Sequence, residues 1–350
     1  MLLAFAFASA IEPVSPDQPG HCQSPRWSPD GRWLSWEVNY LERQAVELFV
    51  AVAGSSAPPR KVGPAAGSST VTAGFGGAGG ARGVAHELTF SPAAINRFVY
   101  AASGAAEDYD LYLDGAGALA AAPGADGNPA WSPDGKSLLF TSARTGQGDL
   151  YLLPLGVAGA QPLRLSGDAT AAEVYGAWAP DSKRVAFVGH TKKGDNLYVI
   201  DDVTFPAPRP FTSWPGVQTR PSWSPDGSRI AFYANREVED RFDLYVVAAA
   251  GGEPQRVATG VVLNPRGPSW LPDGGGLVYV RADDPSFNPV WRVSLADPGR
   301  ARQVPTGTVG NTDVDVVRRA DGKTWLAVAA QGRVGDAVRD FRRIYTMALE

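Results

Sequence analysis

Short runs in which apolar and polar residues alternate recur along the chain, and several begin after the same kind of turn. Residues 136–140 (KSLLF), 184–187 (RVAF) and 229–232 (RIAF) each follow a turn that contains Pro and Asp. Alternation with a period of two is typical of β-strands that bury one face. The pattern therefore predicts an all-β protein built from short antiparallel strands.

The turn is the motif Trp-Ser-Pro-Asp-Gly, which is complete at residues 27–31, 131–135 and 223–227. Pro favours the second turn position, Asp tolerates the third, and Gly takes the left-handed conformation that ends the turn. A type I turn followed by a left-handed glycine often joins two antiparallel strands. We therefore predict hairpins and expect the repeated aspartate to shape the turn rather than bind a ligand, at Asp30, Asp134, Asp226 and Asp273.

A second mark follows each turn by about twenty residues: an acidic or amide residue, an aliphatic residue and an aromatic residue. It occurs at residues 47–49, 110–112, 149–151, 196–198 and 243–245. This mark predicts a third strand. A glycine-rich turn and a short fourth strand, such as residues 255–258, come next.

These units repeat along the whole chain. The aligned turn positions are Trp27, Phe90, Trp131, Trp178, Trp223, Trp270 and Arg318. From Phe90 onward the spacings are 41, 47, 45, 47 and 48 residues. A period of about 40–50 residues with about four strands per unit is the signature of a β-propeller. The sequence therefore predicts a seven-bladed β-propeller of four-stranded antiparallel blades, with six blades as the alternative.

We interpret residues 1–350 as one propeller domain. The first spacing, 63 residues, contains the Gly-, Ala- and Ser-rich stretch 63–82, which predicts a flexible insertion between the first two blades. Residues 1–10 (MLLAFAFASA) fit either a strand that closes the ring, with residues 2–8 as the candidate, or the remnant of a secretory signal. The prolines in residues 206–210 predict an outer edge strand of blade four.

The Trp-Ser-Pro-Asp-Gly turn, followed by an aliphatic-aromatic strand and then Asp-Leu-Tyr, resembles the repeat of TolB-type propellers. Similar repeats occur in the propellers of dipeptidyl-peptidase and prolyl-oligopeptidase relatives. The resemblance covers roughly residues 22–349. It implies that the strand ending in Trp is innermost in each blade, and that the Ser-Pro-Asp-Gly turns lie on one face. The loops that enter the inner strands then surround a funnel on the opposite face, which the family usually uses for binding.

Composition narrows the class of partner. The chain has 32 basic and 36 acidic residues, a net charge of −4, which argues against nucleic-acid binding. Cys22 is the single cysteine, so no intrachain disulfide is possible. No apolar run approaches the roughly 20 residues of a membrane span.

We searched the sequence for the motifs of two enzyme classes, serine hydrolases and metal-dependent sugar lyases. A serine hydrolase is disfavoured, because no Gly-x-Ser-x-Gly elbow occurs and the repeats occupy the chain. Some related propellers are metal-dependent sugar lyases that use several histidines, but His21, His86 and His190 match no local metal motif. Asp313 and Asp315 share one face of a predicted strand and are weak candidates for calcium. We therefore assign no catalytic residue and no cofactor.

The loops predicted around the funnel supply candidate contact residues. Arg, Tyr and His suit a protein or peptide partner. Candidates that precede inner strands are His21, Asn128, Tyr175, Arg220, Asn264, Arg266 and Asn311. Candidates between second and third strands are Arg144, His190, Lys192, Arg236 and Asp283.

We therefore expect a non-enzymatic, TolB-like scaffold that binds a protein or peptide through its funnel face. The expected location is the bacterial periplasm or cell envelope, with the cytoplasm as the alternative. Two other hypotheses stay open: a metal-dependent lyase or hydrolase acting on a carbohydrate at the funnel, and a structural subunit of an envelope assembly.

Overall fold

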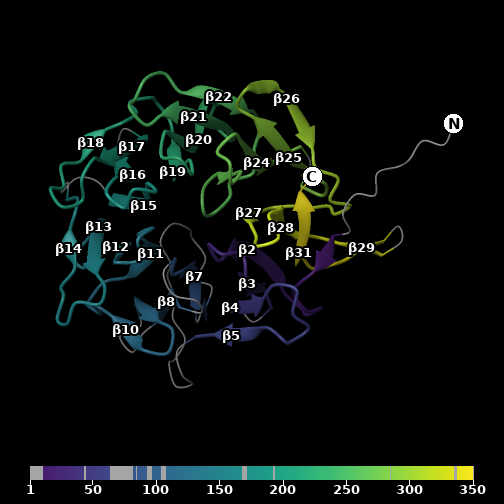
Figure 1. The fold of residues 1–350 in the computed structure, drawn as a ribbon, viewed down its shortest axis with the longest axis horizontal. Helices are drawn as coiled ribbons and strands as arrows, with labels where there is room; N and C mark the ends of the chain where they lie inside the picture. The colour runs from purple at the N-terminus through teal and green to yellow at the C-terminus, as the bar shows by residue number, and fades with distance from the viewer. Residues whose placement is uncertain are drawn as a thin grey trace.

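Seven antiparallel sheets stand in a ring around a common axis, with β2, β7, β11, β15, β19, β23 and β27 innermost (Figure 1). The computed structural model describes residues 11–42, 45–63, 82–83, 85–92, 97–103, 108–167, 172–191, 194–283, 285–334 and 337–349. All regular structure in these residues is β. No helix within the described ranges has the length and apolarity needed to cross a membrane. The predicted seven-bladed propeller of four-stranded blades is confirmed.

The first four blades follow the predicted order of strands. Blade one contains β2 (His21–Trp27), β3 (Trp33–Tyr40), β4 (Ala45–Val52) and β5 (Arg60–Val62), and β6 (Arg82–Gly83) pairs with β4 in parallel. Blade two contains β7 (Ala85–Phe90), β8 (Phe98–Ser103), β9 (Tyr109–Leu113) and β10 (Gly117–Leu119). Blade three contains β11 (Asp126–Trp131), β12 (Ser137–Ser142), β13 (Asp149–Pro154) and β14 (Leu163–Arg164). Blade four contains β15 (Ala172–Trp178), β16 (Val185–Thr191), β17 (Gly194–Ile200) and β18 (Arg209–Pro210).

The last three blades include the point where the ring closes. Blade five contains β19 (Gln218–Trp223), β20 (Arg229–Val238), β21 (Arg241–Ala248) and β22 (Gln255–Ala258). Blade six contains β23 (Ser269–Trp270), β24 (Gly276–Val280), β25 (Val290–Ser294) and β26 (Asp297–Gln303). Blade seven contains β27 (Val314–Arg318), β28 (Thr324–Ala330), β31 (Arg343–Leu349) and β1 (Glu12–Pro13), beside a small hairpin of β29 (Arg333–Val334) and β30 (Ala337–Val338).

The outer strand of blade two, β10, ends at Leu119. Ala120, the next residue, has a φ of 49°, a left-handed conformation outside the β region. In blade four the prolines do lie at the outer edge, because Pro210 belongs to β18. Of the predicted insertion, residues 64–81 lie outside the described ranges.

The repeated turn uses its serine as well as its aspartate. The Ser132 hydroxyl donates to the Asp134 carboxylate at 2.6 Å and accepts the backbone N–H of Ser137 at 2.9 Å. The same carboxylate accepts the N–H of Lys136 at 3.1 Å, and Gly135 has a φ of 73°. The aspartate therefore shapes the turn as predicted, and the serine connects it to the outgoing strand.

Neighbouring blades are joined through the repeated tryptophan. Trp223 packs among residues of blades four and five. The indole Nε1 atoms of Trp178, Trp223 and Trp270 each donate to a carbonyl oxygen of the preceding inner strand, at 3.1 Å in all three cases. This bond fixes where one blade sits against the next, because hydrophobic burial alone has no direction.

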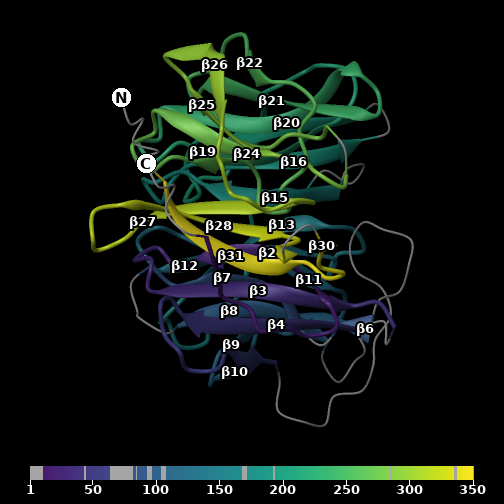
Figure 2. The ribbon, with the colours of Figure 1, turned by 90° about the vertical axis from the view of Figure 1, so that its right-hand side faces the viewer.

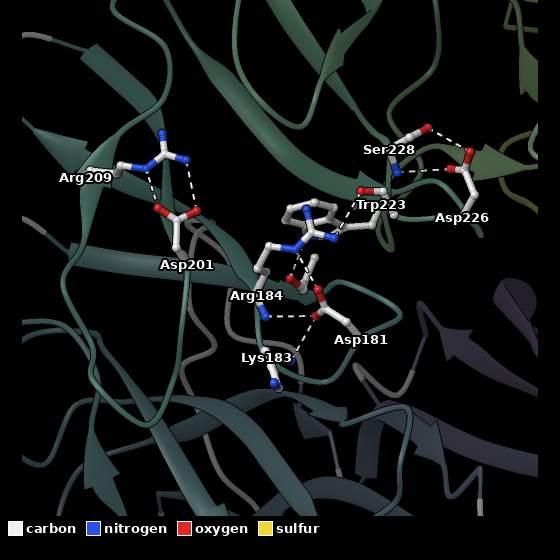
Figure 3. A network of polar contacts seen from close by, with 10 residues as sticks. Asp181, Lys183, Arg184, Asp201, Arg209, Trp223, Asp226 and Ser228 are labelled. Carbon is white, nitrogen blue, oxygen red and sulfur yellow. Dashed lines mark hydrogen bonds and ion pairs between the residues drawn. The ribbon is translucent and has the colours of Figure 1, made fainter.

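An arginine completes the junction of blades four and five on the turn face. The Arg184 side chain donates to Asp181 at 2.6 Å and to the carbonyl of Gly227 at 3.2 Å (Figure 3). Its guanidinium also lies 4.8 Å from the centre of the Trp223 ring. Arg319 lies over the Trp27 ring in the same way, at 5.8 Å, where blade seven meets blade one.

Both ends of the described chain build blade seven. β1 pairs with β31 antiparallel, so an N-terminal strand becomes the outermost strand of a sheet whose other members are C-terminal. In side view β27, β28 and β31 lie against β2 and β3 (Figure 2). The strand lies at Glu12–Pro13, whereas residues 1–10, in which we placed the candidate, are outside the described ranges.

We predict that Ser15→Ala weakens this closure. The buried Ser15 hydroxyl accepts the backbone N–H of Ile344 at 2.9 Å. Its loss leaves that N–H unsatisfied, which costs about 1–3 kcal/mol. Urea denaturation should show a lower midpoint with an unchanged slope. The control is Ser55→Ala, which removes an exposed hydroxyl that also accepts a backbone N–H. Equal midpoints for Ser15→Ala and Ser55→Ala would contradict the assigned role.

Candidate functional site: the central channel

The inner strands of all seven blades enclose a channel with a cavity of about 440 Å³. Its wall reaches from the bulged part of the inner strands to the repeated turns, where Pro29 and Pro133 lie. Four of the predicted contact residues belong to this wall: Asn128, Tyr175, Arg220 and Arg266.

The inner strands of the first five blades share a β-bulge. In each, the register shifts around the residue three positions before the repeated aromatic residue. That residue has a positive φ although it is not glycine: Ser24 (51°), Glu87 (56°), Asn128 (49°), Tyr175 (56°) and Arg220 (53°). Bulges redirect side chains and are frequent next to functional sites. Strained backbone conformations at non-glycine residues also cluster at functional sites.

The equivalent position in the other two blades has a different residue and conformation. In blade six it is Gly267, with a φ of 90°, and its absent Cβ would lie 2.8 Å from the carbonyl oxygen of Arg220. In blade seven it is Asp315, and β27 pairs with β28 without a register shift. A feature visible in the sequence accompanies the bulge: Pro25, Pro129, Pro221 and Pro268 occupy the next position.

Three predicted residues meet at the rim of blades four and five. The Arg220 guanidinium lies 4.4 Å from the centre of the Tyr175 ring and donates to the carbonyl of Pro265. On its other side Tyr175 makes an edge contact with His190, with ring centres 6.4 Å apart. The His190 Nδ1 atom lies 2.8 Å from Asp195. We call Tyr175, Arg220 and His190 the rim cluster.

The carboxylates of Glu37 and Glu87 link the inner strands of blades one to three by hydrogen bonds. Glu87 accepts the backbone N–H of Asn128 at 2.5 Å and its side-chain amide at 2.9 Å. Glu37 in turn accepts the N–H of Glu87 at 3.0 Å and the amide of Gln23 at 3.1 Å. The sequence analysis identified neither glutamate, because their role depends on contacts between blades.

Asp313 and Asp315 perform the same task where the ring closes. Asp313 accepts the N–H of Ser24 at 3.0 Å, and Asp315 accepts that of Trp27 at 2.7 Å. Burial raises the pKa of both carboxyl groups. Both thus act as acceptors for blade one. Among the described residues no group of three or more His, Cys, Asp or Glu side chains is arranged to hold a metal.

Arg26 and Arg266 also belong to the channel wall. Burial lowers the pKa of Arg266, and the nearby charge of Arg26 lowers it further. Glu37, Glu87 and Asp315 act in the opposite direction on the pKa of Arg266. Arg26 had no place in the sequence prediction, since it lies inside a strand directly before Trp27.

Five predicted contact residues lie away from the channel wall. Asn264 is buried and donates to Val314, and Asn311 is buried and donates to Asn288. Arg236 covers Trp214 at 4.3 Å, and His21 makes an edge contact with Phe341. Arg144 is bound within blade three, as described below.

Three residues named in the sequence analysis remain: Asp283, Lys192 and His86. Asp283 pairs with Arg281 at 2.5 Å. Lys192 and the side chain of His86 lie outside what the structure describes. His21 and His190, in blades one and four, contact different partners.

Arg144 is held by a buried ion pair. It donates to Asp126 at 3.0 Å and lies over the rings of Phe140 and Tyr151, at 5.3 and 5.0 Å. Burial raises the pKa of Asp126 to about 6, although Ser142 and Arg144 lower it. The arginine therefore compensates a buried carboxylate within the blade.

The fold defines a seven-bladed β-propeller with a central channel. Residues 173–341 match the family model described as PD40, the TolB beta propeller domain. The TolB-type repeat predicted from the sequence is thereby confirmed.

Solved structures share the fold at low sequence identity. A putative TolB from Agrobacterium tumefaciens is 18% identical, with a TM-score of 0.50 over 95% of this chain and 92% of that one. TolB from Acinetobacter baumannii is 18% identical, with a TM-score of 0.52 over 81% of this chain and 63% of that one. A puromycin-hydrolyzing peptidase from Mycobacterium tuberculosis is 14% identical, with a TM-score of 0.64 over 96% of this chain and 56% of that one. No curated protein matched the sequence.

We predict a pH dependence of stability from Asp126. Its folded pKa of about 6 is above the ordinary value of about 4, so between these values the folded protein binds more protons than the unfolded chain. Stability therefore falls as the pH rises through this window, by up to about 3 kcal/mol. The comparison is with Asp126→Asn, which stays neutral at this position.

Urea denaturation of both proteins at pH 4 and pH 7 tests this prediction. The wild type should lose stability relative to Asp126→Asn between the two pH values, because desolvation of the carboxylate exceeds its attraction to Arg144. A gain of the wild type over the variant at pH 7 would show that the ion pair dominates instead.

Proposed function

We propose that this protein is a non-catalytic propeller that binds a protein or peptide segment at the funnel-side end of its central channel. We further propose that it acts in the bacterial cell envelope. The observation that carries the binding proposal is the set of strained bulges on the channel wall. Three of the five non-glycine bulge residues, Asn128, Tyr175 and Arg220, line the cavity.

The chemistry of the rim cluster supports a protein partner. Tyrosine and arginine are enriched among the residues that contribute most to protein interfaces. Stacking on Arg220 fixes the Tyr175 ring at the edge of the channel. A ring that is already held loses little conformational entropy when a partner packs against it.

The comparisons support the same proposal at the level of the fold. The family model is named for TolB, and two of the similar solved structures carry that name. Other similar structures are enzymes, including the peptidase and an oligogalacturonate lyase in complex with manganese (TM-score 0.50). The choice of a binding protein therefore depends on the channel wall of this chain.

We predict that Tyr175→Ala weakens peptide binding at least tenfold. Random dodecapeptides displayed on phage are selected against the wild-type protein, and the affinities of the enriched peptides are measured by calorimetry. A tenfold loss is the size expected when an interface tyrosine is truncated.

The matched control is Phe205→Ser, which changes an aromatic residue on the exposed outer side of the same blade. It should leave the affinity unchanged. Peptides that lose affinity with Phe205→Ser and keep it with Tyr175→Ala would place binding elsewhere. Failure to enrich any peptide would count against a peptide-binding channel.

A further inference from the structure

We propose that Arg26 and Arg266 form a carboxylate-binding subsite inside the channel, which accepts an acidic side chain of the bound peptide. This inference rests on the proposed function and adds the chemistry of the ligand. The argument starts from the ring of residues directly before each repeated aromatic residue. All seven line the cavity: Arg26, Thr89, Ala130, Ala177, Ser222, Ser269 and Val317.

Arg26 is exceptional in this ring. The other six positions carry small side chains, which leave the middle of the channel open. Arg26 is the one residue of the ring with a long, charged side chain. Its half-buried guanidinium has no side-chain hydrogen bond or ion pair with any described residue. A planar group with five donors therefore faces the cavity with its donors available.

Arg266 presents donors to the same space. Its backbone N–H donates to Asn264, but its guanidinium has no hydrogen bond or ion pair within the described ranges. The contrast is Arg220, whose guanidinium is already bound to Pro265 and stacked on Tyr175. Of the three arginines on the channel wall, Arg26 and Arg266 are thus the two available to a ligand.

The carboxylates near these arginines are used elsewhere. Asp315 lies within electrostatic range of Arg26 and Arg266, and both lower its pKa. It makes no ion pair with either, and one of its oxygens accepts the N–H of Trp27. Glu37 and Glu87 likewise accept bonds from neighbouring inner strands.

The two arginines therefore form an incomplete site. Burial lowers the pKa of Arg266, and the nearby positive charge of Arg26 lowers it further. A carboxylate between them would accept hydrogen bonds from both and reduce the repulsion between their charges. Guanidinium groups suit this task because their paired N–H donors match the two oxygens of a carboxylate.

A peptide carboxylate fits the wall better than a sugar acid does. A sugar ring would need flat aromatic faces, but four of the five repeated tryptophans on the wall are buried: Trp27, Trp131, Trp223 and Trp270. Arg184 covers Trp223, and Arg319 covers Trp27. The indole N–H groups of Trp178 and Trp270 are also bonded to neighbouring blades. The aromatic rings that line the cavity are thus mostly covered, that of Tyr175 by Arg220, whereas the guanidinium donors of Arg26 and Arg266 are available.

The test compares two probes by calorimetry at low salt: N-acetylated, C-amidated tetraglutamate and tetraglutamine. Tetraglutamate should bind at least tenfold more tightly than tetraglutamine, and added salt should reduce the difference. Arg26→Met and Arg266→Met should each remove most of this preference. If both arginines hold one carboxylate, the double variant should lose little more than either single variant.

The control is Arg300→Met, which removes an exposed arginine from β26, the outer strand of blade six. Arg266 lies in the loop before β23, the inner strand of the same blade. Arg300→Met should keep the wild-type preference. Arg266→Met should also unfold at the same or a higher temperature than the wild type, because it removes a partly buried charge that forms no ion pair with a described residue. A lower unfolding temperature would assign Arg266 a structural role and overturn the subsite.

The remaining outcomes separate this inference from the proposed function. Equal binding of the two probes, or no binding of either, overturns the subsite. Phage-selected peptides that still depend on Tyr175 would then leave the proposed function intact. Oligogalacturonate that binds in an Arg266-dependent manner, where tetraglutamate does not, would overturn the assignment to a peptide.

Discussion

The contact on which the ring depends is the one between a repeated aromatic residue and the inner strand of the preceding blade. Burying such a side chain contributes about 2–3 kcal/mol, but burial has no preferred orientation. Orientation comes from the indole N–H, which Trp178, Trp223 and Trp270 donate to carbonyls of the preceding blade. This bond occurs at the same position in the junctions that lead into blades four, five and six, and there it fixes how each blade is oriented against the preceding one.

The last junction of the ring uses different chemistry. Trp27 of blade one packs against blade seven, but its indole N–H has no hydrogen-bond partner among the described residues. The inner strand of blade seven instead receives backbone N–H groups of blade one on Asp313 and Asp315, and Arg319 covers the Trp27 ring. β1 adds main-chain bonds on the outer side. A junction of carboxylates and a borrowed strand therefore replaces the tryptophan bond where the chain must meet itself.

The sequence predicted the blades because each blade is built from local signals. The turn motif, the strand alternation and the acidic mark of the third strand all act within one repeat, and their order matches the observed strands. The channel was predicted less well. Asn128, Tyr175 and Arg220 were recognised as loop-like polar residues before inner strands, whereas Arg26 and Glu87 read as ordinary strand residues. Their roles depend on which blades face each other across the axis, and alternation along one strand carries no information about that.

Backbone strain is concentrated on the inner strands, which contain five of the eight described non-glycine residues with a positive φ. Each non-glycine residue with a positive φ costs about 1 kcal/mol or more, and five inner strands contain one at the same position. Blade seven shows that the fold does not require it, because β27 is regular and Asp315, at the equivalent position, bonds to blade one. Two of the five bulge residues, Ser24 and Glu87, lie off the cavity wall. The other three, Asn128, Tyr175 and Arg220, line the cavity, and it is on these three that the proposed binding site is based.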